Sequence, residues 1–231
     1  MTTHPLASPY SRPAQPELTG GRRIGVLLSH GFTGQPASIT PWGEALAEKG
    51  YAVEVPRLPG HGTTWQELNT LTWADWYAEI TRVFEKLSAE NDAVVVVNPA
   101  LATKRLDVKL LPVLKRVVPS FPGIANDIKK PGVQEHGYDR TPLKAIHSMM
   151  RAWPVLVADL PRITAPVLYF RSTEDHVVDE ATEPLILSGL SSRDVTVTRL
   201  ENSYHVATID NDAELIYEDT AAFVARVASG S

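Results

Sequence analysis

The chain has 231 residues, of which 43% are hydrophobic and 21% charged, which is enough for one domain with a sizeable core. Its formal net charge of −5 indicates no basic face for nucleic acid or an anionic membrane, so we expect a small-molecule partner and no nucleic acid. The absence of cysteine excludes disulfides, a thiolate nucleophile and cysteine-based metal sites.

The N-terminal residues 1–22 favour a flexible tail. Four prolines fall within the first eighteen residues, and no apolar stretch suited to a signal peptide accompanies them. We therefore expect a cytoplasmic protein with no integral membrane segment, whose folded domain spans residues 23–231.

The first part of this domain alternates strands and helices. Residues 23–29 form an apolar run typical of a buried parallel strand, and a helix over 38–49 and a strand over 51–55 are predicted to follow. An amphipathic helix over 73–88 and a wholly apolar strand over 93–97 come next. This alternation predicts an α/β protein with a mostly parallel sheet flanked by helices.

Residues 104–162 break the alternation and are interpreted as an insertion. They contain several prolines, two basic pairs and apolar residues at helical spacing, but no convincing strand. The segment is either a surface helical pair packed on the sheet or a cap whose apolar inner face meets an apolar substrate. The alternation then resumes with a strand over 166–170, a helix over 180–190, a strand over 195–200 and a final amphipathic helix over 212–228.

Six segments together carry a family resemblance: LLSHGFTG, PRLPGHGTTWQEL, VVVVNPAL, DRTPLKAI, PVLYFRSTEDHVV and NSYHVATID. Over residues 23–228 the chain resembles the bacterial carboxylesterase and monoacylglycerol lipase branch of the α/β-hydrolase superfamily. The resemblance implies an α/β-hydrolase fold with a helical cap insertion at about 104–162. It also implies hydrolysis of a small-molecule ester or monoacylglycerol without any cofactor.

The resemblance assigns a role in the oxyanion hole to the loop that follows the predicted strand over residues 23–29. In the resembling enzymes the backbone N–H at the position of Phe32 forms half of the oxyanion hole, because a fixed amide is in place before charge develops on the tetrahedral intermediate. The alternative is a glycine-flanked turn in which Phe32 packs into the cleft. We expect His30 and His61 to order the neighbouring loops and not to take part in catalysis.

The resemblance also assigns a catalytic acid and base. Asp175 follows the PVLYF strand and matches the acid that orients the catalytic imidazole, with Glu174 and Asp179 as near alternatives and an exposed acidic turn as the other interpretation. His205 follows the VTVTRL strand and matches the catalytic histidine, although a lone histidine is usually structural.

The nucleophile of such a site is missing from the sequence. No G-x-S-x-G occurs, and no serine has small residues two places before and after it, as the sharp strand-to-helix elbow requires. At the tip of the 93–97 strand the chain offers Asn98 and Pro99, neither of which is a competent acyl-transfer nucleophile.

The loss lies between Leu87 and Ala93. In related enzymes a strand, the elbow and its helix stand between the helix matching residues 73–88 and the strand matching 94–101, a piece of roughly twenty or more residues. Two hypotheses follow. The chain is a shortened, engineered or incompletely represented version of a serine esterase or monoacylglycerol lipase, or it is a non-catalytic relative that binds an apolar ligand or a partner. A dehalogenase or lyase on this fold would also need a functional group at the missing elbow.

Overall fold

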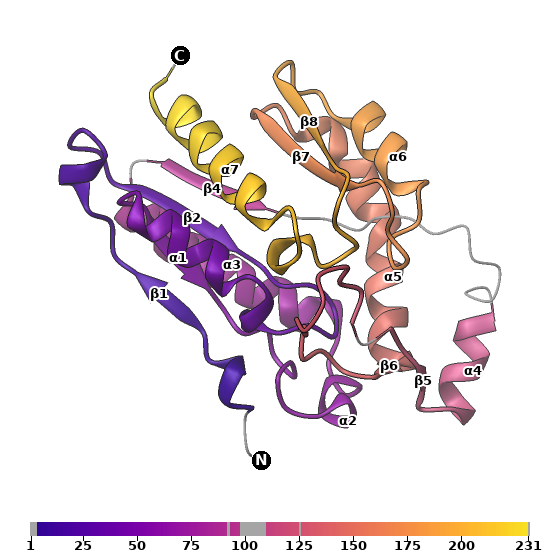
Figure 1. Cartoon of the computed structure of the whole chain (residues 1–231). Coiled ribbons are helices and arrows are strands. Elements are labelled where there is room, and N and C mark those ends of the chain that lie inside the picture. The colour runs from indigo at the N-terminus through magenta and orange to yellow at the C-terminus, as the bar shows by residue number, and fades with distance from the viewer. Residues whose placement is uncertain (1–3, 92, 98–109, 125, 231) are drawn as a thin grey trace.

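The computed structural model describes residues 4–91, 93–97, 110–124 and 126–230 (Figure 1). The strands are β1 Tyr10–Arg12, β2 Ile24–Leu28, β3 Ala52–Val55, β4 Ala93–Val97, β5 Ser120–Pro122, β6 Arg140–Pro142, β7 Val167–Ser172 and β8 Val195–Leu200. The helices are α1 Thr40–Glu48, α2 Trp65–Leu68, α3 Trp73–Glu90, α4 Leu111–Val117, α5 Leu143–Asp159, α6 Thr182–Gly189 and α7 Ala213–Ala228. The α/β class predicted from the sequence is confirmed.

The core forms around a four-stranded sheet of order β1-β3-β2-β4. Every residue of β2 is buried, because the strand is covered on both faces. Val26 and Leu28 face α1 and α7, whereas Leu27 faces α3, where it packs with Val83 and Leu87. Alternate side chains of one strand therefore belong to two separate apolar layers.

The connection between α3 and β4 is very short. A capping box between Thr72 and Asp75 begins α3, the helix ends at Glu90, and β4 begins at Ala93. β4 pairs in parallel with β2, from Ile24 opposite Ala93 to the ends of both strands. The AVVVV strand β4 thus lies directly beside β2, with no strand between them.

The strands β7 and β8 form a parallel pair of their own. Among the described residues no strand ladder joins this pair to the four-stranded sheet, so the single sheet expected from the sequence is divided into two parts. Val195 and Val197 of β8 each keep 38% of their surface exposed. The half of the fold that contains β7 and β8 is therefore less deeply covered than β2.

Two segments differ from the sequence-based expectation. Within the expected tail of residues 1–22, β1 pairs antiparallel with β3, and Ala7 is buried against Gly62, where φ of +66° and a lack of room for a Cβ both require glycine. An edge strand tolerates the flanking prolines. Within 104–162, β5 and β6 form an antiparallel pair of three-residue strands, too short for an alternating pattern to reveal them.

Within the described parts of the chain, no helix combines the length and the apolar character needed to cross a membrane.

Candidate active site

The predicted acid and base are brought together at one edge of the β7–β8 pair. Asp175 follows β7 and His205 follows β8, and parallel neighbouring strands place their following loops side by side. The His205 Nδ1 atom lies 3.2 Å from Asp175 Oδ2. The near alternatives Glu174 and Asp179 do not make this contact: Glu174 lies by His176 and Lys129, and Asp179 accepts from the Ala181 amide.

Asp175 is held as a buried carboxylate, with 6% of its side-chain surface exposed. Its Oδ1 atom accepts the amides of Val177 and Val178 at 2.9 and 2.8 Å, and its Oδ2 atom accepts Arg171 Nη1 at 2.9 Å. Burial by itself would raise the pKa of Asp175, but the hydrogen bond and charge of His205, with the amides of Val178 and Val177, lower it overall. Asp175 is therefore ionised at neutral pH.

His205 has the environment of a base. Burial by itself would lower its pKa, but the hydrogen bond to Asp175 and the negative charges of Asp175, Glu135 and Asp127 raise it overall. Because an ionised carboxylate can only accept, His205 Nδ1–H donates to Asp175 and Nε2 is left for proton transfer.

Asp127 ties the two loops together and was missed by the sequence analysis. Its Oδ2 atom accepts the amides of His176 and His205 at 3.2 and 3.1 Å, and its Oδ1 atom lies 2.7 Å from His176 Nδ1. The Asp127 carbonyl also accepts the amide of Val206 at 3.1 Å. Asp127 lies 49 and 78 positions before its partners His176 and His205, so no local pattern could have indicated it.

The loop that carries Phe32 turns sharply after β2. The Gly34 amide donates to the Gly31 carbonyl at 3.2 Å, and Thr33 has a φ of +67°, a strained conformation for a β-branched residue. The Phe32 ring is turned inward, with its centroid 5.6 Å from Trp76 and 6.3 Å from His61. The loop is thus compatible both with packing of the Phe32 ring and with an oxyanion role of the Phe32 amide. An inward ring does not prevent the backbone N–H from donating a hydrogen bond.

His30 and His61 support this loop from behind. His30 Nε2 accepts the Leu58 amide at 3.1 Å and Nδ1 lies 3.0 Å from the Gly31 carbonyl, which fits a neutral ring that donates from Nδ1. His61 Nδ1 lies 3.1 Å from the Pro59 carbonyl. These contacts are those of loop-ordering residues, as the sequence analysis expected.

Glu135 lies between the Phe32 loop and His205. A Cβ added to Gly34 would lie 2.8 Å from Glu135 Oε1, so the carboxylate rests directly against that loop. Burial raises the pKa of Glu135, while the charge of His205 opposes this and that of Asp127 adds to it. Glu135 is therefore close to both the Phe32 loop and His205. The sequence analysis did not predict a role for Glu135 at this site.

No serine hydroxyl of the described residues forms a hydrogen bond with the His205 ring. Ser29 Oγ donates to the His30 carbonyl, Ser172 Oγ donates to the Tyr204 carbonyl, and Ser148 Oγ accepts the Trp73 amide. The predictions for Asn98 and Pro99 fall outside the described residues.

A carboxylate and a histidine that meet after consecutive parallel strands, opposite a glycine-rich loop after another parallel strand, define the class of α/β-hydrolases. The chain belongs to the family described as serine aminopeptidase, S33, whose profile matches residues 89–212. It is similar to the thermostable monoacylglycerol lipase of Bacillus sp. strain H-257, with 34% identity over 237 aligned positions that cover 92% of this chain and 95% of that protein. It is also similar to the carboxylesterase of Bacillus subtilis strain 168, with 22% identity over 87% of this chain and 92% of that protein.

Solved structures agree with this membership. A structure reported for LipS and LipT, two metagenome-derived lipolytic enzymes, has a TM-score of 0.89 and 36% identity over 97% of this chain and 100% of that chain. The monoacylglycerol lipase of Paleococcus ferrophilus shares the fold with a TM-score of 0.73 and 18% identity, over 98% of this chain and 99% of that one. The chain is therefore a carboxylesterase- or monoacylglycerol-lipase-like α/β-hydrolase, as the resemblance implied.

Proposed function

We propose that this chain carries the acid, base and oxyanion parts of a carboxylic-ester hydrolase site for a small ester or monoacylglycerol. The observation that carries the proposal is the contact of 3.2 Å between His205 Nδ1 and Asp175 Oδ2. In this proposal Asp175 fixes the imidazole tautomer, His205 Nε2 takes the proton of an attacking hydroxyl, and the Phe32 amide stabilises the oxyanion. This chemistry requires no cofactor. The proposal includes a cytoplasmic location, which rests on the sequence alone.

We further propose that the chain as written lacks the nucleophile of this site and does not turn over esters. The G-x-S-x-G motif is absent, and only residues 91 and 92 separate α3 from β4. The alignment lengths support a missing piece. The 237 aligned positions of the Bacillus sp. lipase take up 92% of the 231 residues, about 213, which leaves about 24 positions without a counterpart. For the B. subtilis carboxylesterase, 227 positions and 87% leave about 26.

A second candidate is a non-catalytic relative that binds an apolar ligand. The observation that favours it is the apolar cluster in which Phe32 and Trp76 meet Ala145 and Met149 of α5. In this proposal the insertion of residues 104–162 is a cap, and its helix α5 supplies the apolar inner face that the sequence analysis described.

Hydrolysis of a short-chain p-nitrophenyl ester tests the proposed inactivity. We expect the rate of the purified chain, with its mass of 25.3 kDa verified, to equal that of His205→Ala. A fluorophosphonate probe should label no serine. Turnover that His205→Ala abolishes, or stoichiometric labelling of one serine, would overturn the proposed inactivity and exclude the non-catalytic candidate.

A graft tests whether the acid, base and oxyanion loop are competent. The segment of the Bacillus sp. lipase that precedes its counterpart of β4 is inserted between α3 and β4. By analogy with triad deletions we expect the ester hydrolysis rate to rise by up to about 10⁶-fold. The same graft with its elbow serine replaced by alanine is the control. Equal rates for the two grafts in a folded protein would argue against the roles given to Asp175 and His205.

A further inference from the structure

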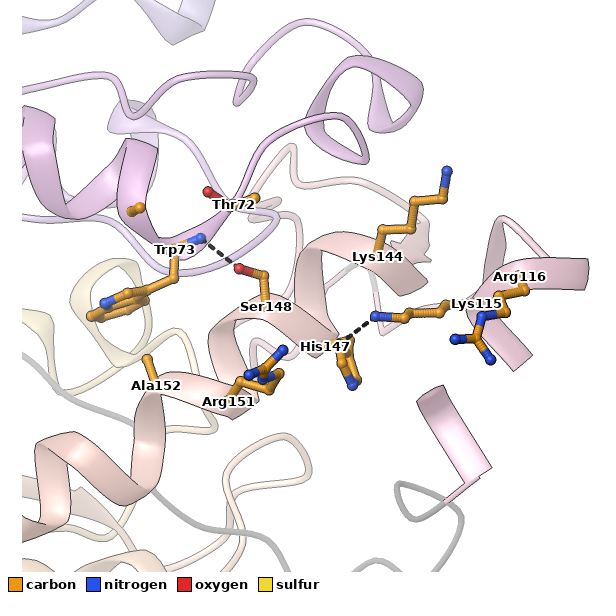
Figure 2. A pocket seen from close by; sticks show the side chains of 10 residues that line it. Thr72, Trp73, Lys115, Arg116, Lys144, His147, Ser148, Arg151 and Ala152 are labelled. Carbon is orange, nitrogen blue, oxygen red and sulfur yellow. Dashed lines mark hydrogen bonds between the residues drawn. The ribbon is translucent and has the colours of Figure 1, made fainter. Parts of the chain in front are cut away.

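A hollow of about 580 Å³ lies on the insertion, between the start of α3, helix α4 and the first half of α5 (Figure 2). Four cationic side chains line it: Lys115 and Arg116 from α4, and Lys144 and Arg151 from α5. No aspartate or glutamate is among the described residues that line it. Within the described ranges none of the four cations forms an ion pair with a carboxylate. The hollow therefore concentrates positive charge that no described carboxylate neutralises through an ion pair.

This concentration is hidden in the overall charge. The whole chain has a formal net charge of −5, but residues 104–162 contain 11 of its 22 lysines and arginines against only 5 aspartates and glutamates. The insertion is thus positive by 6 while the rest of the chain is negative. The expectation that this protein offers no basic face followed from the total and does not hold for this local surface.

The polar groups in the hollow are arranged to donate hydrogen bonds. Lys115 Nζ lies 2.8 Å from His147 Nδ1, so the lysine donates and the imidazole is neutral there. Figure 2 shows Arg151 beside His147, whereas Lys144 points away from this pair and Arg116 lies on the far side of Lys115. Ser148 Oγ accepts the Trp73 amide at 3.0 Å, which leaves its O–H to donate into the hollow.

The electrostatic effect of these cations is seen at His147. The pKa of His147 is lowered, first by burial and then by the positive charges of Lys115 and Arg151. Both cations therefore interact with the same imidazole ring. The carboxylate at the start of α3, that of Asp75, is not among the described residues that line the hollow. Asp75 is engaged with the backbone amide and the hydroxyl of Thr72 at 2.8 and 2.7 Å, as its capping box requires. The positive N-terminal end of the 18-residue helix α3 adds to the same field.

We infer that this hollow is a binding site for a phosphoryl group, held by Lys115, Arg151, the Ser148 hydroxyl and the first turn of α3. Cationic donors on a preformed surface are the groups that bind phosphate oxygens. The volume exceeds what one phosphate needs, so the phosphoryl group can carry an organic substituent. The site is separate from the ester site, because Ala145 and Met149, on another face of α5, pack toward Phe32.

Titration with inorganic phosphate against sodium chloride of equal ionic strength tests the site, with binding followed by the ring signals of His147 in NMR spectra. We expect saturable shifts with phosphate and none with chloride. In the double variant Lys115→Gln, Arg151→Gln the affinity should fall at least about tenfold, because charge-assisted hydrogen bonds are lost. Lys115 loses only its contact with His147, and within the described residues neither side chain forms an ion pair with a carboxylate, so the variant should fold as well as the wild type.

Lys49→Gln is the matched control, because Lys49 is an exposed lysine at the end of α1, far along the chain from the insertion. It should bind phosphate as the wild type does. Equal responses to phosphate and chloride, or an equal loss of affinity in Lys49→Gln and the double variant, would overturn the site.

Two further arms distinguish a free phosphate compound from a lipid headgroup. Sedimentation with phosphatidylglycerol vesicles that inorganic phosphate competes away supports the site with a headgroup as ligand. Phosphate binding without vesicle binding supports it with a free phosphate compound. Vesicle binding that neither phosphate nor the double variant reduces would assign the interaction to general surface charge and refute the site.

Discussion

Two pairs of histidines flank the candidate active site, and their pKa values move in opposite directions. His30 and His61 lie behind the Phe32 loop with ring centroids 4.9 Å apart, and burial lowers their pKa values to about 4 and about 3. The hydrogen bond to Asp127 raises the pKa of His176. The pKa of His205 is raised as well, because Asp175 outweighs the effect of burial.

The difference lies in the carboxylates. Each histidine of the second pair has an aspartate within hydrogen-bond distance, whereas each histidine of the first pair bonds to the backbone. A buried imidazole without a counter-charge stays neutral and supports a loop. An imidazole next to a carboxylate becomes more basic and can accept a proton. The same residue type therefore has structural roles on one side of the site and the environment of a base on the other.

The largest expected effect is the cost of keeping His30 and His61 neutral in acid. In the unfolded chain both take up a proton below pH 6.5, whereas in the folded protein they resist until about pH 4 and about pH 3. Stability from these two groups is therefore present above pH 6.5 and is lost as pH falls. Between pH 7.5 and 5.0 we expect a loss of about 2 kcal/mol per histidine in the free energy of unfolding.

Urea denaturation at the two pH values measures this loss. His176 and His205 have raised pKa values, so their contribution has the opposite sign: it is present below pH 6.5 and declines as pH rises through their folded pKa values. The comparison is therefore made between variants. His61→Gln should lose about 2 kcal/mol less than the wild type between pH 7.5 and 5.0. A ring signal of His30 or His61 that titrates above pH 6 would break the proposed contrast.

An effect of intermediate size on stability is expected when His176 and His205 lose the carboxylate of Asp127, which contacts both. Asp127→Asn removes the charged acceptor that holds the loops of His176 and His205, so we expect a loss of about 1 to 3 kcal/mol in unfolding free energy. It should also lower the pKa values of both His176 and His205, measured by NMR titration. Asp139→Asn, an exposed carboxylate in the same insertion, is the control and should change neither quantity. An unchanged His205 titration in Asp127→Asn would limit Asp127 to a structural role.

The smallest effect is expected for His176→Ala. Its ring keeps 49% of its side-chain surface exposed, so an ion pair with Asp127 in that setting adds little. We expect an unfolding midpoint within the error of the measurement and an unchanged contact between His205 and Asp175. A large fall in the pKa of His205 would mean that Asp127 acts on it through His176 and not through the backbone of both loops.

Local pattern was enough to predict the strands around β2, β3, β7 and β8, the helices α1, α3 and α7, and the meeting of Asp175 with His205. Hydrophobic periodicity gives the elements, and the order Asp175 then His205 after consecutive strands indicates their meeting. The pairing of β4 with β2 could not be predicted from the sequence, because an apolar run carries no information on which strand lies next to it. Asp127 and Glu135 did not follow either, since both lie in an insertion whose contacts are long-range.

The hydrogen bonds that hold Asp175 and His205 make this chain useful as a reference protein for related lipases. The hydrogen bonds of these two side chains, within the described residues, involve only each other, Arg171 and the amides of Val177 and Val178. None comes from β2 or β4. On the proposal that this chain lacks the nucleophile, the basicity of His205 records what the rest of the protein provides to the imidazole. Subtracting it from the value in an intact lipase of this family would isolate the contribution of the serine.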